Sequence, residues 1–129
     1  MKILVVDDEK MQRETLQGFL EKKGYQVFAA ENGAHALRLF SLHPVQLVLL
    51  DHKMPDMNGD EVLARLKEIN PLVHAIMITA YGAVETAVKV MRLGADDFLE
   101  KPVDLLELLE KIERIEQQTA MEEDVAAVT

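Results

Sequence analysis

Two segments of the chain, Ile3–Val6 and Val45–Leu50, are apolar at nearly every position. A strand with one face in water alternates apolar and polar residues, whereas a strand covered on both faces does not have to. Continuous apolar runs of this length are therefore typical of parallel sheets with helices on both sides. Further strands, some of them weaker in pattern, are expected at Gln26–Ala30, Val73–Ile78 and Phe98–Leu99. Together these segments predict a buried parallel sheet.

Segments with the spacing of an amphipathic helix lie between the expected strands. The expected helices are Gln12–Lys23, Ala34–Ser41, Asp60–Ile69, Ala83–Leu93 and Leu105 to about Gln117. Strict alternation of strands and helices implies right-handed crossover connections between parallel strands. We therefore predict an α/β fold of the doubly wound, flavodoxin-like type, with five strands in the order 2-1-3-4-5.

Length and composition limit the class of protein. The chain has 129 residues, which suits one domain. Its 23 acidic and 14 basic residues give a net charge of −9, which disfavours contact with nucleic-acid phosphates. Cysteine is absent, so disulfides and thiolate metal sites are excluded. Because no apolar run suits a signal peptide or a membrane span, we expect a cytoplasmic protein with no direct contact to nucleic acid or membrane.

The C-terminal end of the chain is acidic and weakly patterned. We expect the domain to span residues 1–117, with residues 118–129 as a linker, a frayed helix or a C-terminal extension. The last expected helix carries apolar residues at heptad spacing, namely Leu105, Leu108, Ile112 and Ile115. Packing on the sheet explains this spacing, and a dimerising extension is the alternative, because two heptads are too few to define a coiled coil. The four histidines lack metal-ligand spacing, and surface positions are expected for most of them.

Chemically capable residues follow four of the expected strands. They are Asp7-Asp8-Glu9, Asp51, Thr79 and Lys101. In a sheet of the predicted order, ligands bind beyond the carboxyl ends of the strands. Clustered carboxylates repel each other, and a hard cation such as Mg²⁺, which prefers oxygen ligands, relieves that repulsion. An aspartate can then act as a nucleophile and carry an acyl phosphate, with a lysine and a hydroxyl on the phosphoryl oxygens.

Four segments that include these residues resemble the receiver domain of two-component response regulators. The segments are Val5–Glu9, Asp51–Gly59, Ile78–Tyr81 and Gly94–Pro102, and the resemblance covers roughly residues 2 to 116. The stretch from Thr79 to Val88 is most similar to receivers of the nitrogen-regulation type. In that type a sigma-54-activating ATPase and a DNA-binding domain follow the receiver, so we expect those domains to lie outside this chain.

The resemblance implies roles at the site. Asp51 would be the phosphoacceptor, a sensor histidine kinase the donor, and Thr79 and Lys101 the residues that hold the phosphoryl group. The cofactor would be Mg²⁺ or Mn²⁺. Its ligands would be the side chains of Asp8 and Asp51, the backbone carbonyl of Lys53 and, through a water molecule, Asp7.

The resemblance also implies a switch. Phe98 would turn inward when Thr79 moves, and the change would pass through the fourth helix, the fifth strand and the fifth helix to a dimer partner or a downstream domain. Lys53 and Tyr81 would set the lifetime of the phosphorylated state. The Lys101-Pro102 bond would be cis, which costs little before proline. Such a domain is no enzyme for outside substrates, because it catalyses only its own phosphorylation and dephosphorylation.

Other interpretations of these residues stay open at this point. The acidic triad at residues 7–9 could be a solvated turn, Asp51 a helix N-cap, Thr79 an ordinary strand end and Lys101 a surface charge. A phosphatase of the haloacid-dehalogenase type is a rival, although its Asp-x-Asp-x-Thr stretch has no counterpart at Asp7–Met11. A flavodoxin-like nucleotide carrier would need a phosphate-binding loop with glycine after the first strand. An interaction module that works without phosphorylation is the fourth interpretation.

Overall fold

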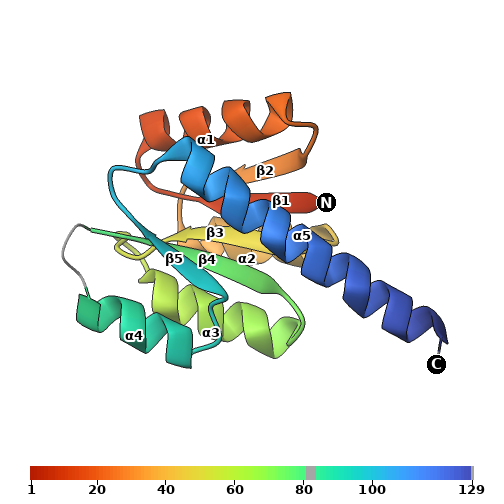
Figure 1. Cartoon of the computed structure of the whole chain (residues 1–129). Helices are drawn as coiled ribbons and strands as arrows, with labels where there is room; N and C mark the ends of the chain where they lie inside the picture. The colour runs from red at the N-terminus through yellow and green to blue at the C-terminus, as the bar shows by residue number, and fades with distance from the viewer. Residues whose placement is uncertain (81–83, 129) are drawn as a thin grey trace.

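The computed structural model describes residues 1–80 and 84–128, in which strands and helices alternate (Figure 1). The strands are β1 (Lys2–Val6), β2 (Gln26–Ala30), β3 (Leu47–Asp51), β4 (His74–Thr79) and β5 (Asp97–Glu100). The helices are α1 (Lys10–Lys22), α2 (Gly33–Leu42), α3 (Gly59–Ile69), α4 (Val84–Arg92) and α5 (Leu105–Val128). The order of elements agrees with the prediction, although the expected helix start at Ala83 lies outside the described residues.

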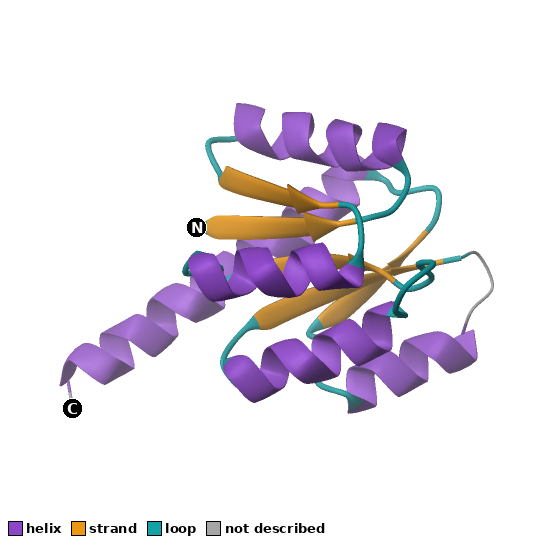
Figure 2. Cartoon of the chain, turned by 180° about the vertical axis from the view of Figure 1, so that it is seen from behind, coloured by secondary structure: helices purple, strands orange, loops and turns teal. Residues whose placement is uncertain are grey.

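The strands form one parallel sheet in the order β2-β1-β3-β4-β5. Helices cover both of its faces (Figure 2). Buried residues of α2, α3 and α4 form a core with one face of the sheet, and buried residues of α1 and α5 form a core with the other. The predicted doubly wound fold and its strand order are therefore confirmed.

The continuous apolar runs are explained by this double coverage. Along β3, Leu47 and Leu49 belong to the core under α1 and α5, whereas Val48 and Leu50 belong to the core under α2, α3 and α4. Successive side chains of a strand point to opposite faces, so both faces require apolar residues. All residues of β3 and β4 are buried as a result.

Gly59 begins α3 in close contact with the end of β3. A Cβ atom at this position would lie 2.5 Å from the carbonyl oxygen of Asp51 and 2.9 Å from Sδ of Met77. The φ angle of Gly59 is not positive, so its backbone conformation does not by itself require glycine. Glycine is needed here because α3 begins in close contact with Asp51, where there is no room for a side chain.

Helix α5 is longer than expected. It continues to Val128 through the segment expected as a linker, a frayed helix or an extension, and projects beyond the sheet (Figure 1). Three of the heptad residues, Leu108, Ile112 and Ile115, are buried in the core shared with α1. Packing on the sheet thus accounts for them. The domain boundary at residue 117 stays a prediction. Within residues 1–80 and 84–128, no helix has the length and apolar content to span a bilayer.

The expectation of a surface position is wrong for one of the four histidines. His74, in β4, is only 6% exposed, and the other three histidines are half-buried. His43 stacks on Phe28 with 4.1 Å between ring centroids. Nδ1 of His74 lies 3.0 Å from Oδ1 of Asp96, and this ion pair allows the ring to be buried.

Candidate functional site

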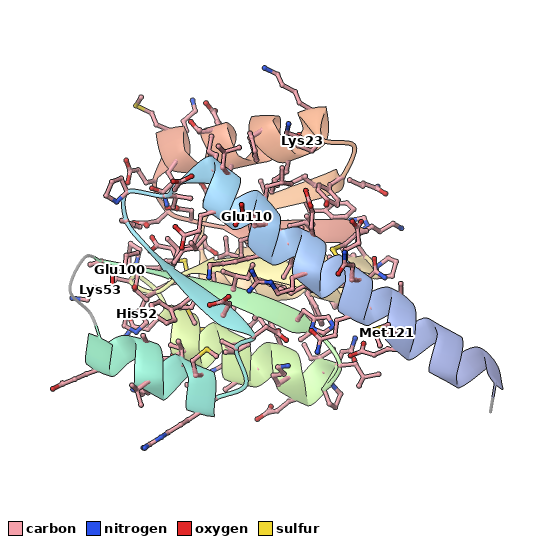
Figure 3. The ribbon with its side chains drawn as sticks, in the orientation of Figure 1. Lys23, His52, Lys53, Glu100, Glu110 and Met121 are labelled. Atoms are coloured by element: carbon pink, nitrogen blue, oxygen red, sulfur yellow. The ribbon has the colours of Figure 1, made fainter. Side chains whose placement is uncertain are left out.

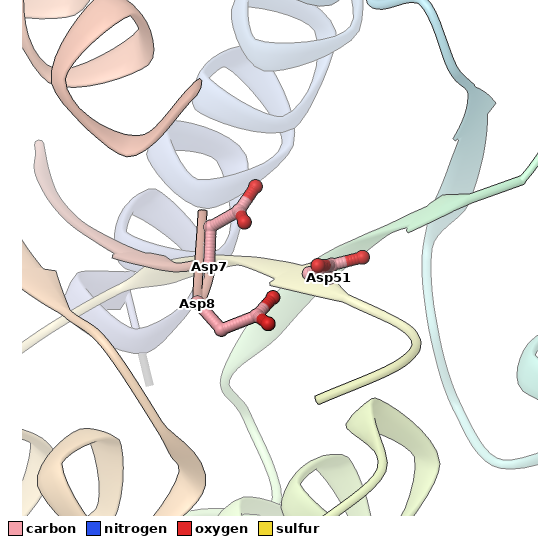
Figure 4. Close-up of side chains that lie close together, drawn as sticks. All are labelled: Asp7, Asp8 and Asp51. Carbon is pink, nitrogen blue, oxygen red and sulfur yellow. The ribbon is translucent and has the colours of Figure 1, made fainter. Parts of the chain in front are cut away.

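Three aspartates meet at the carboxyl ends of β1 and β3. The two strands are neighbours in parallel register, with Val6 opposite Leu50, so Asp7, Asp8 and Asp51 follow at the same edge of the sheet. Carboxylate oxygens of the three residues lie within 4.8 Å of one another (Figure 4). The structure thus brings together residues that are far apart in the sequence, as the strand order predicts.

Lys101 completes this group of charges. Its Nζ lies 3.1 Å from Oδ1 of Asp51, which is only 3% exposed. The position of the lysine follows from the sheet, because its backbone N–H donates to the carbonyl of Thr79 at the end of β4 (2.8 Å). The Lys101-Pro102 bond that follows is cis, as expected.

Burial shifts the pKa values of charged groups in the site. Desolvation raises the pKa of Asp51 to about 6; the hydrogen bond from Lys101 opposes this shift and the charge of Asp7 adds to it. Burial also raises the pKa of Asp7. Burial disfavours the ammonium form of Lys101, but its hydrogen bond to Asp51, together with the negative charges of Asp51, Asp7 and Glu9, outweighs this effect and raises its pKa. Three clustered carboxylates beside one lysine leave excess negative charge, which suits a divalent cation with oxygen ligands.

Asp7 and Asp8 have different surroundings. The Oδ1 atom of Asp7 accepts the N–H of Glu9 (2.8 Å), and Oδ2 accepts the amide of Gln12 (2.7 Å). Asp7 is buried, whereas Asp8 is exposed. Sequence reasoning did not identify Gln12, nor Arg13, whose guanidinium donates to the carbonyl of Asp7 (2.8 Å). Their place in the first turn after the acidic triad was the available signal, because that turn lies beside the end of β1.

Thr79 and Phe98 lie one strand further along the sheet. Thr79 is buried, and its hydroxyl donates to the carbonyl of Leu99 at 3.5 Å. Phe98 is half-buried, packs against the core under α2, α3 and α4, and borders a cavity of about 450 Å³. The other residues that line this cavity are Ala87, Val88, Met91 and Arg92 of α4. An aromatic ring beside a cavity has room to change its position.

The loop after β3 carries the remaining candidates. Lys53 is exposed and lies with His52 at the end of the molecule opposite Met121 (Figure 3). Tyr81 lies outside the described residues. Sequence reasoning missed Asp60, whose Oδ1 is 4.0 Å from Nε2 of His52 and whose Oδ2 is 3.0 Å from Nζ of Lys89. No short-range pattern signals this group, because its members come from the loop, α3 and α4.

The family model for the response regulator receiver domain matches residues 3–113 of the chain. The chain belongs to this family. Membership decides against the haloacid-dehalogenase and nucleotide-carrier interpretations, and it makes the chain a receiver domain of two-component signalling, a phosphoacceptor switch.

Relatives of this receiver include regulators from bacteria. The chain is 38% identical to the regulatory protein AtoC of Escherichia coli K12, over 96% of this chain and 27% of AtoC. It is 39% identical to sporulation initiation phosphotransferase F of Bacillus subtilis, over 88% of this chain and 91% of that protein. The receiver thus spans about a quarter to a half of the length of several regulators that it matches.

Solved structures show the same fold. NtrX from Brucella abortus, in complex with ADP, superposes with a TM-score of 0.93 at 32% identity, over 99% of this receiver and 30% of NtrX. A CheY-like receiver domain from Methanospirillum hungatei superposes with a TM-score of 0.89 at 34% identity, over 94% and 97% of the two chains. The match to NtrX agrees with the resemblance to receivers of the nitrogen-regulation type.

Proposed function

We propose that Asp51 is the phosphoacceptor of this receiver and that Mg²⁺ or Mn²⁺ assists the transfer. The observation that carries the proposal is a buried carboxylate that contacts one lysine and lies within 4.8 Å of two more carboxylates. A carboxylate with a raised pKa and few competing donors is a suitable nucleophile once a cation shares its charge.

The cation ligands in this proposal are the side chains of Asp8 and Asp51 and the backbone carbonyl of Lys53. Asp7 acts through a water molecule, because both of its carboxylate oxygens already accept hydrogen bonds from the protein. Asp8 is exposed and can bind directly. A Mg²⁺ ion held by these residues would offset the negative charge that develops during transfer.

Transfer starts from a phosphohistidine of a sensor kinase. A carboxylate oxygen of Asp51 attacks phosphorus, the phosphorus–nitrogen bond breaks, and the imidazole leaves with the electron pair of that bond. Lys101, now 3.1 Å from Asp51, moves its ammonium to a phosphoryl oxygen. The hydroxyl of Thr79 leaves its long contact with Leu99 and donates to another phosphoryl oxygen.

Movement of Thr79 provides the output. The space it leaves lets Phe98 turn inward from the cavity beside α4, which changes the surface of α4, β5 and α5. Phosphorylation need only favour one of two pre-existing conformations. The changed surface then contacts a second copy of the chain, or downstream ATPase and DNA-binding domains of the kind that the nitrogen-regulation type carries.

Hydrolysis of the acyl phosphate ends the signal. Lys53 is exposed and lies two residues after Asp51, and we assign to it and to Tyr81 the control of water access. The domain in this proposal catalyses only its own phosphorylation and dephosphorylation. It works in the cytoplasm, where the kinase domains of two-component systems meet their receivers.

Incubation with acetyl phosphate and Mg²⁺, followed by intact mass analysis, tests the proposal. The wild-type chain should gain one phosphoryl group, and Asp51→Asn should gain none. Size-exclusion chromatography of the same samples then reports whether phosphorylation changes the oligomeric state. A wild-type chain that stays unmodified, or an Asp51→Asn variant that is modified equally well, would overturn the assignment and favour an interaction module that needs no phosphate.

A further inference from the structure

The loop between β3 and α3 contacts the start of α2 through one carboxylate. Oδ1 of Asp56 accepts the backbone N–H of Gly33 (3.1 Å), and Oδ2 accepts that of Ala34 (3.2 Å). The first N–H groups of a helix have no partner within the helix and favour an anionic acceptor. Asp56 thus supplies from a distant loop what a helix normally obtains from its own N-cap residue.

The same helix also has its own cap. Oδ1 of Asn32 accepts the N–H of His35 (2.8 Å), and the carbonyl of Asn32 accepts the N–H of Ala36 (3.0 Å). The N–H groups of Gly33, Ala34 and His35 are therefore all satisfied, two of them by Asp56. Since Asn32 already caps the helix, the contact from Asp56 has a second consequence, which is to hold the loop.

Packing supports the contact. A Cβ atom on Gly33 would lie 3.0 Å from Cβ of Met57 and 3.0 Å from Cγ2 of Val62, so the loop lies directly against the backbone of α2. The other end of the loop is closed by the N–H of Gly59, which donates to the carbonyl of His52 (2.7 Å). Between these attachments Lys53 is exposed. The Asp56 contact therefore limits how far the segment that contains Lys53 can move.

The position of the contact in the sheet places it across the acidic site. Helix α2 follows β2 and the loop follows β3, and β1 lies between these two strands. The contact between Asp56 and α2 therefore spans the end of β1, where Asp7 and Asp8 lie. The contact thus joins the start of α2 to the loop after β3, on either side of the site that the proposed function assigns to the cation.

We propose that Asp56 is a positioning residue for the cation site: by binding the N-terminus of α2, it fixes the loop that presents Asp51 and the Lys53 carbonyl. This inference rests on the proposed function. Ligand-orienting contacts of this kind control metal affinity without touching the metal. The carboxylate of Asp56 is also well suited to this contact, because the N–H of Gly33 lowers its pKa and keeps it ionised.

The test compares Asp56→Ala with Asn32→Ala in the full chain. Both variants remove hydrogen bonds from the start of α2, but only Asp56→Ala releases the loop. Isothermal titration with Mg²⁺ should show a Kd about tenfold higher for Asp56→Ala. Asn32→Ala should keep the wild-type Kd although it loses thermal stability. Asp56→Asn, which retains one acceptor oxygen, should lie between wild type and Asp56→Ala.

A second readout separates binding from chemistry. Phosphorylation by acetyl phosphate, measured against Mg²⁺ concentration, should need more Mg²⁺ in Asp56→Ala and should reach the wild-type rate at saturation. An unchanged Kd in Asp56→Ala, or an equal increase in Asn32→Ala, would overturn this inference and leave the proposed function intact. A wild-type chain that binds no Mg²⁺ would overturn both.

Discussion

Lys101 lies with its Nζ 3.1 Å from Oδ1 of Asp51, so the cation from the end of β5 contacts the carboxylate that ends β3. The two strands are not neighbours, because β4 lies between them. The lysine side chain therefore reaches past the end of β4 to make this contact. We propose that the same ammonium moves onto a phosphoryl oxygen when Asp51 is phosphorylated.

Replacement of Lys101 should slow phosphorylation much more than it lowers stability. Loss of a preorganised charge that stabilises developing anionic charge costs roughly 10²–10³ in rate. We expect a decrease of this order for Lys101→Ala in acetyl phosphate assays at saturating Mg²⁺. Lys101→Arg should recover only part of the rate, because the guanidinium has another shape and charge distribution. A wild-type rate in Lys101→Ala would exclude contact between this residue and the phosphoryl group.

Without divalent cations, Asp51 should make stability depend on pH. Burial raises its pKa to about 6 in the folded chain, from the ordinary 3.8. Between these values the folded state binds more protons than the unfolded state, so the free energy of unfolding decreases as pH rises through this window. Urea unfolding from pH 4 to pH 7 in the presence of EDTA should show the decrease. Asp51→Asn should show a smaller one, and an equal decrease would contradict the assignment.

His74 should also make the free energy of unfolding depend on pH, in the direction expected for a base whose pKa is raised on folding. Its hydrogen bond to Asp96 raises its pKa above 6.5 despite burial, with Glu122 of α5 adding to the shift. The contribution to stability is therefore complete below 6.5 and is lost as pH rises through the folded pKa. Burial opposes ionisation of Asp96, but the hydrogen bond to His74 lowers the pKa of this carboxyl, and the positive charge of Lys67 in α3 adds to the shift.

Thermal unfolding between pH 6 and pH 9 checks the role of His74. The wild-type chain should lose more stability than His74→Gln over this interval. His35→Gln serves as the matched control, because His35 is only half-buried at the start of α2. If His74→Gln follows the wild-type curve, the ion pair with Asp96 does not persist in solution.

Replacement by alanine should change the free energy of unfolding in opposite directions at two glycines. Gly59→Ala places a methyl group 2.5 Å from the carbonyl oxygen of Asp51, and we expect a loss of roughly 2–4 kcal/mol. Gly18 is exposed within α1, and a Cβ atom there would have no neighbour within 4 Å, so Gly18→Ala should add about 0.5–1 kcal/mol. Chemical denaturation measures both. Equal effects at the two positions would show that α3 does not start against Asp51.

Lys53 should affect the lifetime of the signal and not the fold. Its side chain is exposed, so Lys53→Ala should change the free energy of unfolding by less than about 0.5 kcal/mol. We expect a changed rate of dephosphorylation, measured as loss of the phosphoryl group by intact mass after removal of acetyl phosphate. Lys23→Ala, another exposed lysine at the far end of α1, is the control. Identical decay in wild type and Lys53→Ala would show that Lys53 does not control water access.

The sequence by itself determined the elements, their order and the sheet. Hydrophobic patterns are local properties of the sequence, and a strand covered on both faces must be apolar along its length. The apolar runs Ile3–Val6 and Val45–Leu50 therefore indicate strands with helices on both sides. The strand order then predicts that Asp7, Asp8 and Asp51 meet, because parallel strands end at one edge. The resemblance of four short segments to receiver domains suggested roles for the site residues, which hydrophobic patterns cannot indicate.

Only the tertiary structure decided the contacts between residues that no pattern links. The carboxylate of Asp56 on the start of α2, the pair of His74 with Asp96, and the approach of Gly59 to Asp51 each depend on two segments that meet only in the folded chain. The structure also decided between a linker, a frayed helix and an extension for residues 118–129, because weak patterning beyond Gln117 left these alternatives open and α5 continues to Val128. Hydrogen bonds and charges act over a few ångströms in space, and separation along the sequence does not report that distance.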